Sequence, residues 1–318
     1  MSSTGPVPRT DLPVLRRRGE RPRRRGPDTL FGRFAAPAIT TMTLVVAVPS
    51  LFTVFLSFTD WRGLGSPMSA AGLRNYAALW YSDTFRTAML NTFVLVLGGG
   101  VAIFAIVFLM LIGLRQMRGA AFARSVVFVP MIVSPIAIGV ALGFLLNPNG
   151  AVNDLLGSIG LEEFQRAWLA PDMVFQMIVL GLIWSMSGYY LAIVATGVDQ
   201  IPPYLYEEAQ LAGATRWQQF WMITLPLSWE AASVAVVLWL ISGMKTFEIV
   251  IAFVGTQGAP PLQARTAAVQ QFLATTGGRD GTPQLGAAAA IGIAIFVFTA
   301  VFVVLARRLL RRDAVEVA

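Results

Sequence analysis

Long hydrophobic runs alternate with shorter polar segments along the chain. The runs long enough to cross about 30 Å of hydrocarbon as helices are six in number and cover residues 34–58, 88–114, 122–146, 173–198, 228–254 and 285–306. An open strand cannot cross lipid with unpaired backbone groups, so runs of this length predict helices. The pattern therefore predicts an all-α protein of the cell membrane with multiple spans.

The arginines are distributed unevenly over the segments that connect these runs. Counting Arg124 at the start of the third run, seventeen lie before the first run, after the second, between the fourth and fifth and after the last, whereas six lie in the remaining segments. Because basic residues concentrate on the cytoplasmic side, both termini are expected there. The sequence thus predicts an Arg-rich, disordered cytoplasmic tail at 1–33, a six-helix transmembrane domain at 34–306 and a cytoplasmic tail at 307–318.

The composition supports a membrane protein and excludes several classes of site. Hydrophobic residues make up 56% of the chain and charged residues 13%, about half the charged share of a soluble domain. The absence of cysteine and histidine removes thiolate metal sites and most acid–base catalysis near neutral pH. No phosphate-binding loop of the G-x-x-x-x-G-K-[ST] type occurs. We therefore expect no catalytic residue, metal site or cofactor in this chain.

The basic stretch "RRRGERPRRR" stands close before the first hydrophobic run. It has no interleaved aromatic residues, which argues against a nucleic-acid partner. A tail that fixes the topology and contacts anionic lipid is the favoured interpretation.

The polar segment between the fourth and fifth runs contains "EEAQLAGATRWQQFWMITLP" at 207–226. Pro202 and Pro203 suit the first turn of a helix, and Gly213 suits its end. A Thr-x-x-Gln capping box at Thr215 then predicts the start of a second helix, which Pro226 ends or kinks. The segment is expected to form a helix–turn–helix.

This helix–turn–helix carries an acidic patch and an aromatic face. Glu207 and Glu208 lie early in the first helix, while Trp217, Phe220 and Trp221 follow at helical spacing in the second. The short helices either lie in the bilayer interface or project into a groove on a soluble partner. An interfacial anchor normally carries several basic residues, and only Arg216 is basic here, so the partner is favoured.

The stretch "LYEEAQLAGATRWQQFWMITLP" resembles the EAA loop of binding-protein-dependent ABC importer permeases. The matching positions are Glu207, Ala209, Gly213, Ile223, Leu225 and Pro226. Glu208 and Ala212 depart from the usual alanine and aspartate, which affects the detailed fit. The resemblance implies that residues 199–226 dock onto a cytoplasmic ATPase as a coupling loop, with Glu207, Glu208, Ala209, Gly213, Trp217, Phe220 and Pro226 as the coupling residues.

Further stretches resemble sugar permeases of the maltose and glycerol-phosphate type. They are "LRNYAALW" at 73–80, "NPNGAVNDLLGSIGL" with "WLAPD", and "GMKTFEIVIAFVGTQGAP" with Glu248, Gln257 and Ala259 as departures. The resemblance implies a type I ABC importer permease that carries a sugar or oligosaccharide. It also implies a second, non-identical permease, two ATPase subunits that bind ATP and Mg²⁺, and an extracytoplasmic solute-binding protein.

Lys245 and Glu248 lie within the fifth run, three residues apart. If one helix carries both, they share a face and can neutralise each other; alternatively, they line a gate or pathway. The glycines at 98–100 and the Gly139–Gly143 pair are expected to permit close helix packing.

A secondary transporter or channel is the alternative function, with 199–226 as an interfacial linker. It requires coupling carboxylates at mid-bilayer, and the centres of the six runs lack Asp and Glu.

Overall fold

The structure, a computed structural model, describes residues 29–114, 117–254, 260–278 and 281–311. Residues 1–28 of the predicted tail 1–33, residues 312–318 of the predicted tail 307–318, and residues 255–259 of the stretch that resembles sugar permeases lie outside these ranges. The chain divides into two compact units, Met1–Leu51 and Phe52–Ala318. Over the described residues the regular structure is helical, with a single isolated antiparallel bridge between Thr59 and Ala70.

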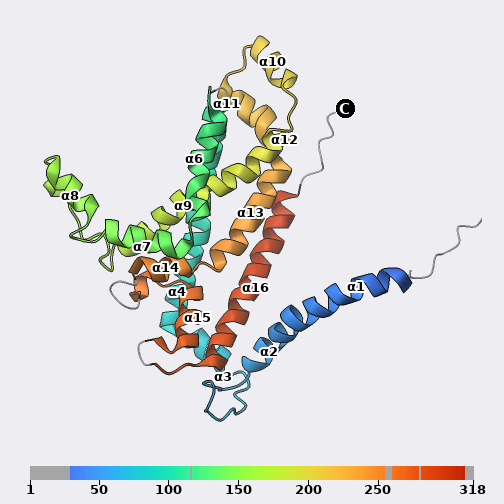
Figure 1. The fold of residues 1–318 in the computed structure, drawn as a ribbon, viewed down its shortest axis with the longest axis vertical. Coiled ribbons are helices and arrows are strands. Elements are labelled where there is room, and N and C mark those ends of the chain that lie inside the picture. Colours follow the sequence, from blue (N-terminus) through green and yellow to red (C-terminus); the bar gives the residue numbers. More distant parts are fainter. Residues whose placement is uncertain (1–28, 115–116, 255–259, 279–280, 312–318) are drawn as a thin grey trace, which may run out of the picture. The chain divides into compact units, whose positions relative to one another are not determined.

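Figure 1 labels the α-helices where there is room, and η in the text denotes π-helical and 3-10 turns. In chain order they are α1 (Thr29–Met42), η1 (Thr43–Ala47), α2 (Val48–Leu56), α3 (Arg74–Tyr81), α4 (Asp83–Phe93), η2 (Val94–Gly99), α5 (Gly100–Leu114), α6 (Ala120–Ile132), α7 (Pro135–Leu145), α8 (Ala151–Ser158), η3 (Glu162–Phe164), α9 (Val174–Val198), α10 (Tyr204–Leu211), α11 (Arg216–Gln219), η4 (Phe220–Thr224), α12 (Leu225–Leu227), α13 (Trp229–Met244), α14 (Glu248–Val254), η6 (Leu262–Ala264), α15 (Ala267–Thr276) and α16 (Leu285–Leu310).

Four helical stretches are long and apolar enough to cross a membrane. They are Phe34–Leu56, Asp83–Leu114, Val174–Val198 and Leu285–Leu310. Two further stretches qualify only as bent pairs, Ala120–Ile132 with Pro135–Leu145 and Arg216–Leu227 with Trp229–Met244. The described residues therefore provide four spans, or up to six if each bent pair is one span.

The third predicted run is not one continuous helix. Its two halves, α6 and α7, are bent by 93°, because Val133 and Ser134 are extended, with ψ angles of 138° and 136°. The ring of Pro135 clashes with a helical conformation at the preceding residue, so a helix ends before it. The run 122–146, predicted as one helix, therefore forms two.

The fifth predicted run, 228–254, is also interrupted. Helix α13 ends at Met244, and α14 begins at Glu248. The carbonyl of Thr246 accepts a hydrogen bond from Thr266 Oγ1 at 2.8 Å, so a tertiary contact, not a helical turn, satisfies this backbone group. In addition, the second helix of the 199–226 segment leads into α13 through a bend of 75°.

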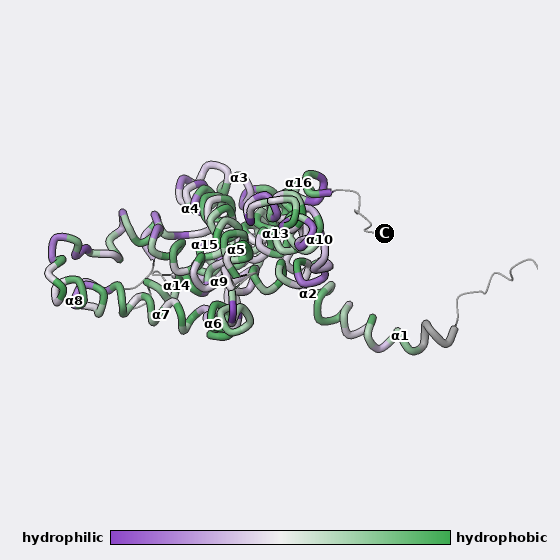
Figure 2. Tube along the Cα trace, turned by 90° about the horizontal axis from the view of Figure 1, so that it is seen from above, coloured by the Kyte–Doolittle hydropathy of each residue, from purple (hydrophilic) through white to green (hydrophobic). Residues whose placement is uncertain are grey.

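Helix α9 lies at the centre of the second unit and packs against α5, α6 and α13. The buried Trp239 on α13 donates from Nε1 to the carbonyl of Val96 at 2.7 Å. Gly100 lies directly beneath this indole, and a β-carbon there would overlap it. The expected packing role holds for Gly100, whereas a β-carbon at Gly99 would make an ordinary contact with Trp239 at 3.6 Å and one at Gly98 would meet nothing within 4 Å. Figure 2 shows hydrophobic residues along the long helices and hydrophilic residues gathered in connecting loops.

The glycine pair of α7 allows this helix to approach α14 closely. A β-carbon at Gly139 would lie 2.7 Å from Cβ of Ala252, and one at Gly143 would lie 2.6 Å from the carbonyl oxygen of Phe253. Small residues at such spacing let two helix backbones come together. The predicted packing role of this pair is confirmed.

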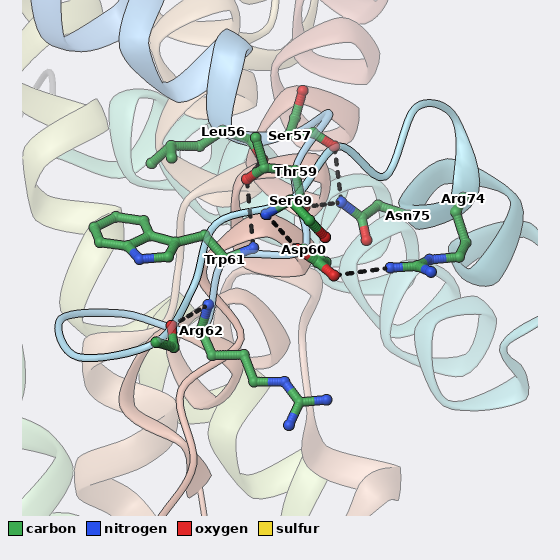
Figure 3. A network of polar contacts seen from close by, with 10 residues as sticks. Leu56, Ser57, Thr59, Asp60, Trp61, Arg62, Ser69, Arg74 and Asn75 are labelled. Atoms are coloured by element: carbon green, nitrogen blue, oxygen red, sulfur yellow. Dashed lines mark hydrogen bonds and ion pairs between the residues drawn. The ribbon is translucent and has the colours of Figure 1, made fainter.

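The loop between α2 and α3 is held by a polar network (Figure 3). The side-chain nitrogen of Asn75 donates to the carbonyls of Ser57 and Thr59 at 2.9 and 2.7 Å. Asp60 accepts from the backbone N–H of Ser69 at 2.9 Å and pairs with Arg74 at 3.4 Å. The hydrogen bonds from Ser69, followed by the charge of Arg74, lower the pKa of Asp60. These interactions of Asp60 stabilise the fold while its carboxyl group is ionised. This stabilisation is lost as pH falls through the lowered pKa of Asp60.

Candidate functional site

The 199–226 segment begins with a short helix that carries two exposed carboxylates. Pro203 caps α10, and the N–H groups of Tyr206 and Glu207 donate to its carbonyl at 3.0 and 3.2 Å. Glu207 and Glu208 are exposed in the first two turns, where the positive end of the helix dipole favours negative charge. Ala209, on the same helix, is half-buried.

Helix α10 ends in a left-handed turn at Gly213, as the sequence predicts. The backbone at Gly213 has φ of +80°, a conformation that a residue with a β-carbon resists. The N–H of Gly213 donates to Gln210 and that of Ala214 donates to Ala209, each at 2.9 Å. This pair of bonds is the Schellman arrangement, which satisfies the last carbonyls of a helix.

The next helix starts two residues later, at the predicted capping box. The N–H of Gln218 donates to Thr215 Oγ1 at 3.3 Å, and the N–H of Thr215 donates to Gln218 Oε1 at 2.8 Å. These reciprocal bonds satisfy two N–H groups that a helix start leaves open. The reversal between α10 and α11 is therefore defined by local bonds on both sides.

Two side-chain hydrogen bonds tie the second helix back to the first. The hydroxyls of Tyr206 and Thr224 lie 3.1 Å apart and are buried. The buried side chain of Gln219 donates from Nε2 to the carbonyl of Ala214 at 3.0 Å. Because these bonds cross from α10 and the turn to α11 and η4, the segment is braced internally.

The aromatic side chains of the second helix do not form one exposed face. Trp217 and Trp221 are 55% and 50% exposed, whereas Phe220 is 3% exposed. The ring of Phe220 packs against Phe108 of α5, with centroids 5.6 Å apart. Phe220 therefore attaches the segment to the helix bundle and cannot offer its ring to a partner, contrary to the sequence-based prediction. Trp217 and Trp221 remain available.

The segment joins α13 at a bend that follows Pro226, as predicted. Pro226 is half-buried in α12, and the helix direction changes by 75° at Ser228. The hydroxyl of Ser228 donates to the carbonyl of Thr224 at 2.6 Å. The indole of Trp229 donates to the carbonyl of Leu310 at 2.6 Å, which ties the start of α13 to the end of α16.

Lys245 and Glu248 do not share a helix. Lys245 is the C-cap of α13, with φ of −98° and ψ of 5°, and Glu248 starts α14. Both residues are exposed, and the ion pairs found among the described residues do not include them. The expected pairing along one helix face is wrong because the helix breaks between them; their role in a gate or pathway stays a prediction.

An ion pair that sequence reasoning missed lies at the start of the 199–226 segment. Arg124 Nη1 donates to both carboxylate oxygens of Asp199, at 2.9 and 3.1 Å. Arg124 is on α6 and Asp199 is the C-cap of α9. The residues are 75 positions apart in sequence, so no local pattern links them.

The part of the chain that the structure describes contains no cluster of three or more metal-ligating residues. Its polar groups near the 199–226 segment serve helix capping, bracing and charge presentation.

Comparisons with known proteins identify the family. Residues 113–313 match the model of the binding-protein-dependent transport system inner membrane component family. The chain is 33% identical over 222 residues to the probable ABC transporter permease protein YurN of Bacillus subtilis. The aligned region covers 67% of this chain and 75% of that protein. It is 28% identical over 312 residues to the diacetylchitobiose uptake system permease protein NgcF of Streptomyces coelicolor, covering 91% of this chain and 85% of that protein.

A solved structure has the same fold. A chain of a bacterial ABC transporter involved in the import of the acidic polysaccharide alginate superposes with a TM-score of 0.74 at 24% identity, covering 90% of this chain and 96% of that chain. A second alginate transporter structure, in complex with an alginate pentasaccharide-bound periplasmic protein, gives a TM-score of 0.72 at 23% identity, covering 91% and 96%. The chain belongs to the binding-protein-dependent transport system inner membrane component family and is a transmembrane permease subunit of an ABC importer.

Proposed function

We propose that the 199–226 segment is the element by which this permease docks onto a cytoplasmic ATPase subunit. The main support for this proposal is that the 199–226 segment combines internal bracing with exposed groups that a partner can recognise. Tyr206 and Gln219 hold its two helices together, while Glu207, Glu208 and Trp217 are exposed. A braced segment transmits a push from its tip to its base without deforming, which coupling between two conformations requires.

An interfacial anchor would need a different distribution of charge. Peripheral helices that lie on anionic lipid carry Lys or Arg on their polar face. Here the exposed charges of α10 and α11 are Glu207, Glu208 and Arg216, with a net negative sign that anionic headgroups repel. The same carboxylates suit a basic groove on a protein partner.

The proposed topology has six spans with both termini in the cytoplasm. It counts the bent pair α6 and α7 as one span, takes the fifth span to begin at α13, beyond the bend at Ser228, and rests on the arginine distribution for orientation. The 199–226 segment then lies on the cytoplasmic side between spans four and five, where an ATPase is accessible.

The proposed assembly contains two permeases, two ATPase subunits and an extracytoplasmic binding protein. The chain contains no phosphate-binding loop of the G-x-x-x-x-G-K-[ST] type, so ATP and Mg²⁺ are assigned to the ATPase subunits. One 199–226 segment contacts one ATPase, which requires a second permease for the second ATPase. We propose that this permease is a homologous, non-identical chain.

The proposed cargo is a sugar or oligosaccharide. The relatives include an uptake permease for diacetylchitobiose, a probable permease for starch degradation products and a permease for lactose. These proteins share a carbohydrate substrate class but differ in the individual sugar. The binding protein is expected to make that final selection.

The docking proposal is tested by reversing one charge at the tip of the segment. Glu207→Lys should weaken retention of the ATPase subunits during purification of the complex, because the added charge repels a basic groove. Glu163→Lys is a matched control, since Glu163 is also an exposed glutamate but lies in η3. Both variants are purified at equal expression, and the amount of ATPase per permease is measured.

The expected result is loss of ATPase from Glu207→Lys alone, with membrane insertion and the second permease retained. Full retention of the ATPase with normal solute transport would show that Glu207 takes no part in docking. Equal loss from both variants would point to a general charge effect and would also count against the proposal.

A further inference from the structure

The Arg124–Asp199 ion pair joins two helices, α6 and α9, at the start of the 199–226 segment. Of the ion pairs found among the described residues, the other two link residues within the region 60–86, whereas this one joins α6 to the end of α9. Asp199 lies three residues before Pro202, where the 199–226 segment turns into α10. The pair therefore lies where the segment leaves the helix bundle.

Helix electrostatics alone would not place a carboxylate at this position. Asp199 caps the C-terminus of α9, and its N–H donates to the carbonyl of Ala195 at 2.8 Å. The negative end of the helix dipole disfavours an anion there. Arg124 supplies the compensating charge through two hydrogen bonds from Nη1.

The guanidinium of Arg124 is only partly exposed. Its Nε is buried and has no acceptor within the part of the chain that the structure describes, so the hydrogen bonds of this side chain run from Nη1 to Asp199. Three residues after Arg124, the carbonyl of Val127 on α6 lies so close to Gly188 of α9 that a β-carbon at Gly188 would overlap it. The missing side chain of Gly188 therefore allows α6 to lie close against α9. Close backbone packing and the ion pair together fix α6 on the end of α9.

We infer that Arg124 and Asp199 are positioning residues that link the 199–226 segment to α6. This inference rests on the proposed docking function of that segment. Movement of α10 by an ATPase pulls on the end of α9, and the pair passes that movement to α6. Beyond the 93° bend, α6 continues into α7, which packs on α14. The pair thus joins the docking segment to a second part of the membrane domain.

The link predicts a loss of coupling without a loss of docking. Arg124→Gln and Asp199→Asn each remove one charge at similar side-chain size, and the charge exchange Arg124→Asp with Asp199→Arg rebuilds the pair. Arg86→Gln is a matched control, because it breaks the exposed pair with Asp83 inside α4. The readouts on the reconstituted complex are ATPase retained per permease and solute transported per ATP hydrolysed.

Both single variants should retain their ATPase subunits but transport about five-fold less solute per ATP hydrolysed, the low end of usual coupling between sites. The charge exchange should recover most of that loss, and Arg86→Gln should behave like the unmodified protein. A purely structural role would lower the amount of complex but not the solute transported per ATP hydrolysed, so this transport ratio tests the inference. If the Arg124→Gln variant does not accumulate, the Asp199→Asn variant provides the test.

An unchanged ratio in the single variants would overturn the inference, as would a fall that the charge exchange does not recover. Either result leaves docking intact, because docking is judged separately from the Glu207→Lys variant. Loss of ATPase from the Arg124 or Asp199 variants would also overturn the inference, by assigning the pair to docking itself.

Discussion

Phe220 and Trp221 show how far helical spacing determines the role of a side chain. Adjacent positions on a helix are about 100° apart, so a stripe that includes both Phe220 and Trp221 is wide enough for one edge to face the bundle. Phe220 occupies that inner edge against Phe108, and Trp221 lies on the outer edge at 50% exposure. One aromatic stripe thus divides into an anchor and an exposed surface.

This division predicts opposite effects of two alanine substitutions. Phe220→Ala should lower the unfolding free energy of the permease by about 3–5 kcal/mol, as expected for removal of a buried ring. Trp217→Ala removes an exposed ring, so thermal stability should change little while ATPase retention falls. Thermal unfolding of the purified complex and co-purification of the ATPase measure the two effects. A destabilised Trp217→Ala variant with full ATPase retention would contradict the division.

Local features of the 199–226 segment could be predicted from sequence, and tertiary ones could not. The left-handed turn at Gly213 and the capping box at Thr215 depend on neighbours a few residues away. The burial of Phe220 depends on Phe108, and the charge partner of Asp199 is Arg124; both partners are distant in sequence. No periodicity within the segment contains that information.

At the scale of elements, hydropathy predicted where apolar helices occur but not where they bend. The run at 122–146 is apolar throughout, yet α6 and α7 meet at 93°. The signal for the bend was Pro135, whose effect on the preceding residue is local. The break after Met244 had no such signal, because it depends on the contact between Thr246 and Thr266. This break is also what separates Lys245 from Glu248.

The contact between α7 and α14 gives a prediction about helix packing. Gly143→Ala places a β-carbon 2.6 Å from the carbonyl oxygen of Phe253, so the helices must separate, at a typical overpacking cost of about 1–3 kcal/mol. Gly98→Ala is the control, because its β-carbon would have nothing within 4 Å. The melting temperature of the complex should fall for Gly143→Ala only. Equal melting temperatures for the two variants would argue against close packing at this site.

At the scale of the whole molecule, the chain is one component of a larger transport machine. Its family membership assigns a permease, and the described residues include polar networks that brace and connect helices. Under the proposed topology, the Asp60 network lies on the extracytoplasmic side of the membrane, whereas the 199–226 segment and the Arg124–Asp199 pair lie on the cytoplasmic side. The proposal therefore places the contact with the ATPase, which supplies the energy, on the cytoplasmic side.

The most direct measurement of the central claim is a site-specific cross-link in the assembled complex. The chain contains no cysteine, so Glu208→Cys and Glu163→Cys each create a single thiol at an exposed position in this chain. A short thiol-to-amine cross-linker is added to membranes that contain all subunits. The account predicts that Glu208→Cys forms a covalent product with the ATPase subunit and that Glu163→Cys does not. Absence of an ATPase product from Glu208→Cys, or an equal yield from Glu163→Cys, would contradict it.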